Sequence, residues 1–148
     1  MSEIIYRSAQ SGDIEGIHNL VLELAIFEKE PDAVTVDVAY YKKCFEEGTF
    51  QAIVADKDGS IVGMTLFYMS FSTWKGKMMY LEDFVVHPDY RNMGIGKKLW
   101  DAWIQESKNQ GAKMVKWQVL DWNTNATRFY EREGATIEKQ WWNGKIIF

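Results

Sequence analysis

The residues best suited to chemistry lie in a glycine-rich turn, Arg91-x-x-Gly94-x-Gly96, which follows an apolar run from Met78 to Val86. These glycines predict bare backbone at the start of a helix, where N–H groups lack partners and the helix dipole is positive. Such a turn can bind an anion, and it suits a pyrophosphate. The spacing matches neither the G-x-G-x-x-G of dinucleotide-binding folds nor the G-x-x-x-x-G-K-[ST] of NTPases.

Two flanking elements must hold this turn in place. The apolar run up to Val86 predicts a buried strand, and His87-Pro88 ends it because proline cannot donate to a sheet ladder and biases the preceding residue away from helix. After the turn, apolar residues recur at three- and four-residue spacing, which predicts a helix. That apolar stripe is Leu99, Trp100, Trp103 and Ile104. Strand, turn and helix together predict a phosphate-binding unit.

The remaining elements follow from periodicity and turn residues. Strands are predicted over residues 4–8, 50–55, 61–71, 113–120, 135–141 and 145–148, the last two forming a hairpin. Helices are predicted over residues 14–28 and 125–133. Another is predicted from a cap at Thr35 or Asp37 to Gly48, and the helix that follows the glycine turn is predicted to end at Gly111. This order predicts an α/β (α+β) fold in one domain, residues 1–148, with a mixed, mainly antiparallel sheet and helices on both faces.

Composition narrows the possible functions. The net charge is −4, from 17 basic and 21 acidic residues, and no basic block stands out, which argues against nucleic acid as the main ligand. With one cysteine and two histidines, the chain predicts no disulfide and no metal site. No apolar run approaches the roughly 20 residues of a membrane span, and the N-terminus lacks the order of a signal peptide. We expect a soluble, cytoplasmic protein with no membrane partner.

A second motif follows the predicted strand at residues 113–120. It has Asn123 and Ala126, then Phe129-Tyr130, then Gly134. With the Arg91-x-x-Gly94-x-Gly96 turn, it resembles the GNAT N-acetyltransferases, which implies the acyl-coenzyme-A N-acyltransferase fold and acetyl-coenzyme A as the donor.

Further stretches are similar to the diamine (spermidine/spermine and thialysine) N-acetyltransferases. These are Leu24-Ala-x-Phe27-Glu28 and Trp74-x-Gly-Lys-x-x-Tyr80-Leu-Glu82-Asp83-Phe84. The resemblance covers nearly the whole chain and implies a homodimer. One departure is Glu133, where that family tends to have a basic residue near the coenzyme phosphates.

The resemblance implies a place for each part of the coenzyme. The backbone of Phe84, Val85 and Val86 would pair with the pantetheine arm as an added strand does, and one N–H would face the thioester oxygen. Arg91 and Lys97 would add charge at the pyrophosphate. The backbone N–H groups that would hold it belong to Asn92, Met93, Gly94, Ile95, Gly96 and Lys97. Asn123 and Ala126 would contact the pantetheine.

Acetyl transfer to an amine also needs a base and an acid. An alkylamine has a pKa of ~10.4, so a base must remove a proton at neutral pH. Glu82 is the preferred base and an acceptor contact; Asp83 would point to the opposite face of a regular strand unless a bulge brings both to one side. One of the two could instead be a surface carboxylate or a salt-bridge partner. Tyr130 is the candidate acid, since the resemblance implies a place near the thiol; otherwise it is a core tyrosine.

The acceptor itself would be a small cationic amine, namely a polyamine, a diamine or a lysine-like amino acid. By resemblance, Phe27, Glu28 and Trp74 would contact it through charge pairing and cation–π interaction, although Glu28 could equally be a solvated residue at a helix end. We interpret Cys44 as an inert core thiol remote from both motifs, so that the amine attacks directly in a ternary complex. A protein lysine, an N-terminus or an antibiotic amine is the alternative acceptor. A non-catalytic acyl-coenzyme-A sensor is the alternative function.

Overall fold

A five-stranded sheet forms the centre of the first of two compact units, which ends at Gln118. The structure is a computed structural model that describes residues 3–148. The strands are β1 (Ile5–Ser8), β2 (Gln51–Lys57), β3 (Ser60–Ser72), β4 (Gly76–Val86) and β5 (Met114–Trp117). They lie in the order β1-β2-β3-β4-β5, and only β4 and β5 pair in parallel. The expected mixed, mainly antiparallel sheet is confirmed.

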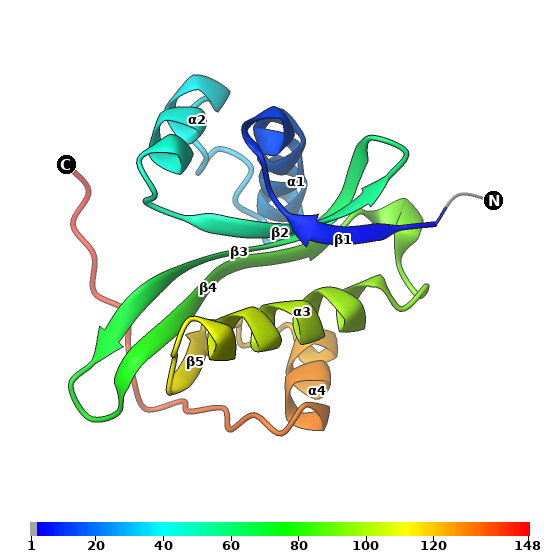
Figure 1. The fold of residues 1–148 in the computed structure, drawn as a ribbon. Helices are drawn as coiled ribbons and strands as arrows, with labels where there is room; N and C mark the ends of the chain where they lie inside the picture. The colour runs from blue at the N-terminus through cyan, green and yellow to red at the C-terminus, as the bar shows by residue number, and fades with distance from the viewer. Residues whose placement is uncertain (1–2) are drawn as a thin grey trace. The chain divides into compact units, whose positions relative to one another are not determined.

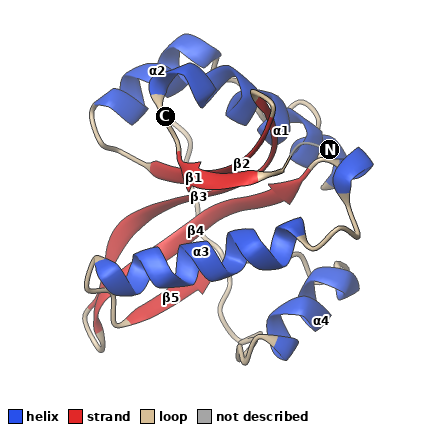
Figure 2. Cartoon of the chain, turned by 45° about the vertical axis from the view of Figure 1, so that its right-hand side comes forward, coloured by secondary structure: helices blue, strands red, loops and turns tan. Residues whose placement is uncertain are grey.

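Helices cover both faces of this sheet, as expected. Figures 1 and 2 show α1 (Ile14–Phe27) and α2 (Val38–Glu46) on one face and α3 (Ile95–Asn109) on the other. In β2 the four residues from Ala52 to Ala55 are all buried, which requires cover on both faces. On the α1 face the buried core consists of Ile14, Ile17, Leu20, Val21, Ala52, Val54, Met64, Leu66 and Val85.

Tryptophan packing and one glycine hold α3 close to the sheet. Trp103 lies 6.5 Å from the ring of Phe67, and its indole also contacts Trp100 at 5.1 Å. A Cβ at Gly63 would lie 3.0 Å from Leu99 Cδ1 on α3 and only 3.2 Å from a backbone carbonyl oxygen of β4. The close approach of α3 to β3 therefore depends on the missing side chain.

Local signals explain several element ends. Asp37 caps α2 by accepting a hydrogen bond from the Tyr40 N–H at 2.9 Å. Of the two caps that the sequence allowed, Thr35 and Asp37, the structure therefore uses Asp37. A short 3₁₀ turn, η1 (Ser11–Asp13), precedes α1. Its Asp13 carboxylate accepts from Arg7 Nη1 at 2.7 Å, and Arg7 Nη2 reaches Asp56 Oδ2 at 3.0 Å. This ion-pair cluster ties η1 to β1 and β2.

The second unit, Val119–Phe148, contains α4 (Thr124–Arg132). Asn123 caps this helix, its Oδ1 accepting from the Ala126 N–H at 3.3 Å. The predicted hairpin over residues 135–148 is wrong, because these residues form no helix or strand. An isolated two-stranded hairpin is only marginally stable, so a favourable turn sequence is not enough to form one. Within residues 3–148, no helix is both long and apolar enough to cross a bilayer.

Candidate active site

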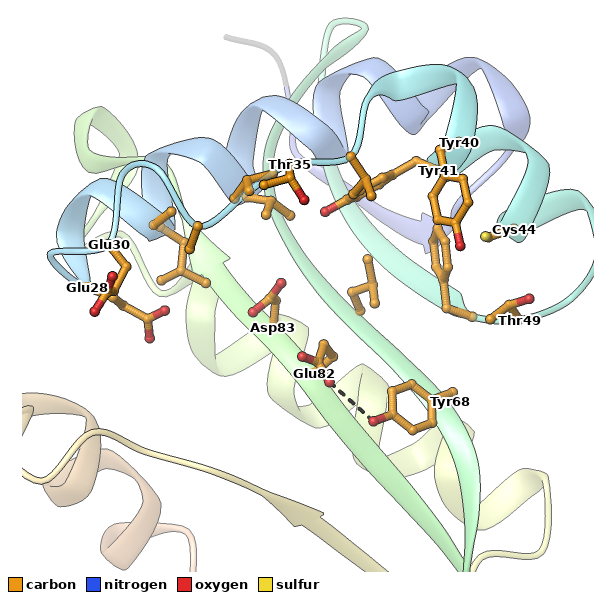
Figure 3. A pocket seen from close by; sticks show the side chains of 18 residues that line it. Glu28, Glu30, Thr35, Tyr40, Tyr41, Cys44, Thr49, Tyr68, Glu82 and Asp83 are labelled. Carbon is orange, nitrogen blue, oxygen red and sulfur yellow. Dashed lines mark hydrogen bonds between the residues drawn. The ribbon is translucent and has the colours of Figure 1, made fainter. Parts of the chain in front are cut away.

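A pocket of about 550 Å³ opens on the α1 face of the sheet. Its walls come from the end of α1, the loop after it, α2, β3 and β4. Figure 3 shows four carboxylates around it: Glu28 and Glu30 at one end, and Glu82 and Asp83 along β4. Among the described residues that line it there is no lysine, arginine or histidine. We refer to it as the acidic pocket.

A β-bulge explains how two adjacent residues of β4 reach the same pocket. Leu66 pairs with Asp83, while the next residue, Phe67, pairs with Leu81, so Glu82 has no residue opposite it. In a regular strand, neighbours point to opposite faces, but the extra residue of a bulge resets the alternation. Both Glu82 and Asp83 therefore line the acidic pocket. The bulge named as a possibility from the sequence is confirmed.

The two carboxylates have different surroundings. Glu82 is exposed, and its Oε1 accepts a hydrogen bond from the Tyr68 hydroxyl at 3.2 Å. Asp83 is partly buried, and no described residue donates a hydrogen bond to its side chain or forms an ion pair with it. Burial, followed by the charges of Glu82 and Glu28, raises the pKa of Asp83 to about 7. Asp83 is thus a carboxyl group that titrates near neutral pH.

Aromatic side chains complete the wall. Tyr40, Tyr41 and Tyr68 all line the acidic pocket (Figure 3). Burial and the charge of Glu82 raise the pKa of Tyr68 to about 12, and burial with the charges of Asp83 and Glu82 raises the pKa of Tyr41 as well. The phenols of Tyr41 and Tyr68 therefore stay protonated at neutral pH. The wall therefore offers neutral π-faces and negative charge, a combination that suits an organic cation.

The glycine turn has the backbone geometry that an anion site requires. Gly94, at φ = 80°, is the N-cap of α3, and Asn92 also has a positive φ of 63°. No side chain caps this helix end, so the first N–H groups of α3 point away from the helix without a cap. Arg91 donates from Nε to the Val86 carbonyl at 3.2 Å, and its guanidinium lies 5.6 Å from the ring centroid of Phe27.

The edge of β4 next to the turn offers a second feature. β5 pairs only with Met78 to Leu81, and no other strand in the described part of the chain pairs with that edge from Glu82 to Val86. An extended chain can add to such an edge through main-chain hydrogen bonds. The uncapped turn at the start of α3 fits a pyrophosphate, and the open edge of β4 that precedes it along the chain fits an extended arm. The two features together suit a ligand that has both groups.

The structure brings together only part of the predicted acceptor set. Glu28, Glu82 and Asp83 meet in the acidic pocket. Phe27 does not line it and instead contacts Arg91, and Trp74 lies 83% exposed in the β3–β4 connection. An acceptor contact of these two aromatic residues stays a prediction.

The residues predicted from the second motif belong to the second unit. Tyr130 is buried on α4, with its ring 5.7 Å from that of Phe129, and Asn123 caps the same helix. Their roles toward a coenzyme stay predictions.

Sequence reasoning missed several pocket residues. Cys44 was interpreted as a core thiol, which is wrong, because it is only partly buried and lines the acidic pocket together with Glu82 and Asp83. The available signal was its position on α2, where Tyr40 and Tyr41 precede it by four and three residues and so share its face. Glu30 was missed too, because it lies in a loop without periodicity.

This chain is similar to acetyltransferases of known sequence and structure. The model of the acetyltransferase (GNAT) family matches residues 15–135. A thialysine N-epsilon-acetyltransferase of Bos taurus is 36% identical over 145 residues, covering 91% of this chain and 85% of that protein. The Caenorhabditis elegans protein of the same name is 32% identical over 117 residues, covering 79% of this chain and 73% of its own length.

Solved structures show the same fold. An aminoglycoside acetyltransferase from an uncultured soil sample has a TM-score of 0.81 at 21% identity, covering 98% of this chain and 96% of that one. An aminoglycoside N-acetyltransferase in complex with CoA has a TM-score of 0.79 at 18% identity, covering 98% and 96%. At such identities the likeness concerns the fold alone.

Proposed function

Because the chain belongs to the GNAT acetyltransferase family, we propose that it transfers the acetyl group of acetyl-coenzyme A to the primary amine of a small cationic acceptor. The observation that carries the choice of acceptor is the acidic pocket, with four carboxylates and no cation among its lining residues. Opposite charge raises the local concentration of a cationic substrate, and desolvated walls strengthen the attraction.

Acetyl-coenzyme A supplies an activated thioester, and the chain must hold it and accept protons. We propose that the N–H groups of residues 92–97 bind the pyrophosphate, with Arg91 and Lys97 adding charge. The open edge of β4, from Phe84 to Val86, pairs with the pantetheine arm and offers an N–H to the thioester oxygen. Asn123 and Ala126 contact the arm. These assignments follow from the family motifs and from the turn and edge described above.

Proton transfer falls to carboxylates and a phenol in this proposal. An acceptor arrives mainly as its ammonium form, because an alkylamine has a pKa of ~10.4. Glu82 and Asp83 are the two candidates that take its proton, since the bulge brings both to the acidic pocket. Tyr130 gives a proton to the departing thiolate. No covalent acetyl-enzyme is needed, and the amine attacks directly.

The acidic pocket also favours one class of amine over another. The related enzymes named for thialysine and ornithine act on amino acids, which carry an α-carboxylate. In this chain, the pocket lining offers four carboxylates and no cation to such a group. Because like charges repel in a partly desolvated site, we propose a diamine or polyamine without a carboxylate as the preferred acceptor.

Release of free thiol from acetyl-coenzyme A tests the proposal. Cadaverine and L-lysine are a matched pair, since they differ only in the α-carboxylate; spermidine and a lysine peptide complete the panel. We expect kcat/KM for cadaverine to exceed that for lysine by at least about tenfold, which corresponds to about 1.4 kcal/mol. A preference for lysine would refute the carboxylate argument, and turnover of the peptide alone would refute the small acceptor. Coenzyme binding without any turnover would indicate a sensor.

The assembly is a separate part of the proposal. We expect a homodimer, as the resemblance to diamine acetyltransferases implies. Light scattering after size-exclusion chromatography measures the mass directly, and a mass of one chain would refute this expectation.

A further inference from the structure

We infer that Asp83, rather than Glu82, is the group that takes the proton from the acceptor amine. This inference rests on the proposed acetyl transfer and assigns one step of it. It begins from the bulge in β4, which leaves Asp83 opposite Leu66 and places Glu82 beside it on the pocket side of the sheet. Without the extra residue, only one of the two acids would face the acceptor.

The first argument is the availability of the two carboxylates. Glu82 already accepts a hydrogen bond from the Tyr68 hydroxyl at 3.2 Å and is exposed to solvent. The Asp83 carboxylate has no hydrogen-bond or ion-pair partner among the described residues, and apolar side chains such as Leu24 and Leu66 share its wall. A desolvated carboxylate without a donor has the strongest tendency to accept a proton from a bound ammonium.

The second argument is the charge around Asp83. From the end of α1 and its loop, Glu28 and Glu30 line the same pocket, and Glu82 is its neighbour on β4. α2 contributes the phenol of Tyr41, and β3 that of Tyr68. No cation lines the pocket within the described residues. Burial and the charges of Glu82 and Glu28 accordingly raise the pKa of Asp83 to about 7.

A pKa near 7 matches the task. A base is most effective when it is ionised at the working pH and still holds a proton well. Relative to a carboxylate at the ordinary 3.8, an Asp83 at about 7 binds a proton roughly a thousandfold more tightly. Glu82 and Glu28 then act on the reaction through Asp83, because their negative charges keep its proton affinity high.

The proton balance is simple. The Asp83 carboxylate takes one proton from the ammonium, and the freed nitrogen lone pair forms the C–N bond with the thioester carbon. The C–S bond breaks, Tyr130 protonates the thiolate, and the second proton lost by the nitrogen replaces the one that Tyr130 gave. Each turnover therefore releases one proton to solvent, from Asp83, together with the free thiol and the amide.

The pH dependence of kcat/KM distinguishes the two acids. With cadaverine, the wild type should show an acid limb near pH 7, since kcat/KM reports groups of the free enzyme. Asp83→Asn should lose at least about a hundredfold in kcat/KM and lose this limb. Glu82→Gln should lose less than about tenfold at pH 9 and shift the limb to lower pH, because a like charge beside Asp83 is gone. Glu28→Gln should shift it in the same direction.

A second readout does not depend on turnover. The carboxyl ¹³C resonance of Asp83, assigned as the signal absent from Asp83→Asn, should titrate near pH 7 in the free protein and lower in Glu82→Gln. Circular dichroism confirms that both variants fold. Loss of the acid limb in Glu82→Gln rather than in Asp83→Asn would overturn the inference, as would titration of Asp83 near 4. Absence of turnover by the wild type on the whole amine panel would instead refute the proposed function.

Discussion

Replacing Asp83 by asparagine should stabilise the protein at alkaline pH, and the size of the effect follows from its surroundings. In the folded chain burial raises the pKa of Asp83 from 3.8 to about 7. Between these values the folded state binds more protons than the unfolded state, so the free energy of unfolding falls as the pH rises. Above about pH 7 the fully ionised carboxylate costs the folded state about 4 kcal/mol, at 1.36 kcal/mol for each pKa unit.

Asparagine carries no charge, so the folded variant lacks this ionisation cost, but burying its amide destabilises the folded state by a different amount. That amide contribution does not depend on pH, so comparing the two proteins at two pH values removes it. From pH 5 to pH 8 the stability of Asp83→Asn relative to the wild type should increase by about 3 kcal/mol, because roughly two pKa units of that window lie below the folded-state value. For a chain of this length, about 3 kcal/mol corresponds to roughly 6 to 12 °C in Tm.

Urea unfolding followed by tryptophan fluorescence measures both free energies at each pH. The matched control is Asp32→Asn, an exposed carboxylate in the loop after α1 that is hydrated in both states. It should change the free energy of unfolding equally at pH 5 and pH 8. If Asp83→Asn also showed the same difference at both pH values, the carboxylate would be ionised in the folded state at pH 5, and the reasoning from its burial would be refuted.

Three further predictions concern other parts of the first unit. Arg7→Gln should lower the free energy of unfolding by about 2 kcal/mol, because it removes the ion pair with Asp13. Arg7 holds the pKa of Asp13 below its usual range, so this loss, measured by urea titration, should shrink below about pH 4. A loss that does not depend on pH would contradict the ion-pair account. Gly63→Ala should cost about 1–3 kcal/mol in thermal unfolding, since the new Cβ meets a backbone oxygen at 3.2 Å. Gly12→Ala, with nothing within 4 Å, is its control, and equal losses in both would count against the packing argument. Alkylation of Cys44, the one cysteine, by N-ethylmaleimide should slow at least about threefold with saturating cadaverine but not with 1,5-pentanediol, and an unchanged rate would show that the amine binds elsewhere.

Local sequence signals were sufficient to predict most of the elements. The cap at Asp37, the proline after His87 and the glycine at residue 94 each act over a few residues, and each ends or begins an element in the structure as expected. The terminal hairpin was predicted on equally local signals and is absent. A strand needs a partner edge, and the turn residues Asn143-Gly144 carry no information about whether one is available.

The site was harder to predict than the elements, because its walls meet through long-range packing. Glu82 and Asp83 were found from the sequence because they stand next to each other on the predicted strand that leads into the glycine turn. The α2 residues Tyr41 and Cys44 were not, because their spacing shows only that they share a helix face, and nothing local indicates that this face lines a cavity opposite β4. Which acid is desolvated also depends on that packing, so the sequence could only rank Glu82 and Asp83 by position.

The bulge at Glu82 accounts for the contrast between the two acids. On either side of it the ladder is regular, with Leu81 opposite Phe67 and Asp83 opposite Leu66, so Glu82 is a single residue added to an otherwise regular pairing. The added residue projects a charge to the pocket side without displacing Asp83 from its place over the core. That charge remains in contact with solvent and Tyr68, and it adds to burial, the larger cause, in raising the pKa of Asp83. Burial of Asp83, together with a charged residue inserted beside it in the strand, therefore gives an aspartate whose pKa suits a base at neutral pH.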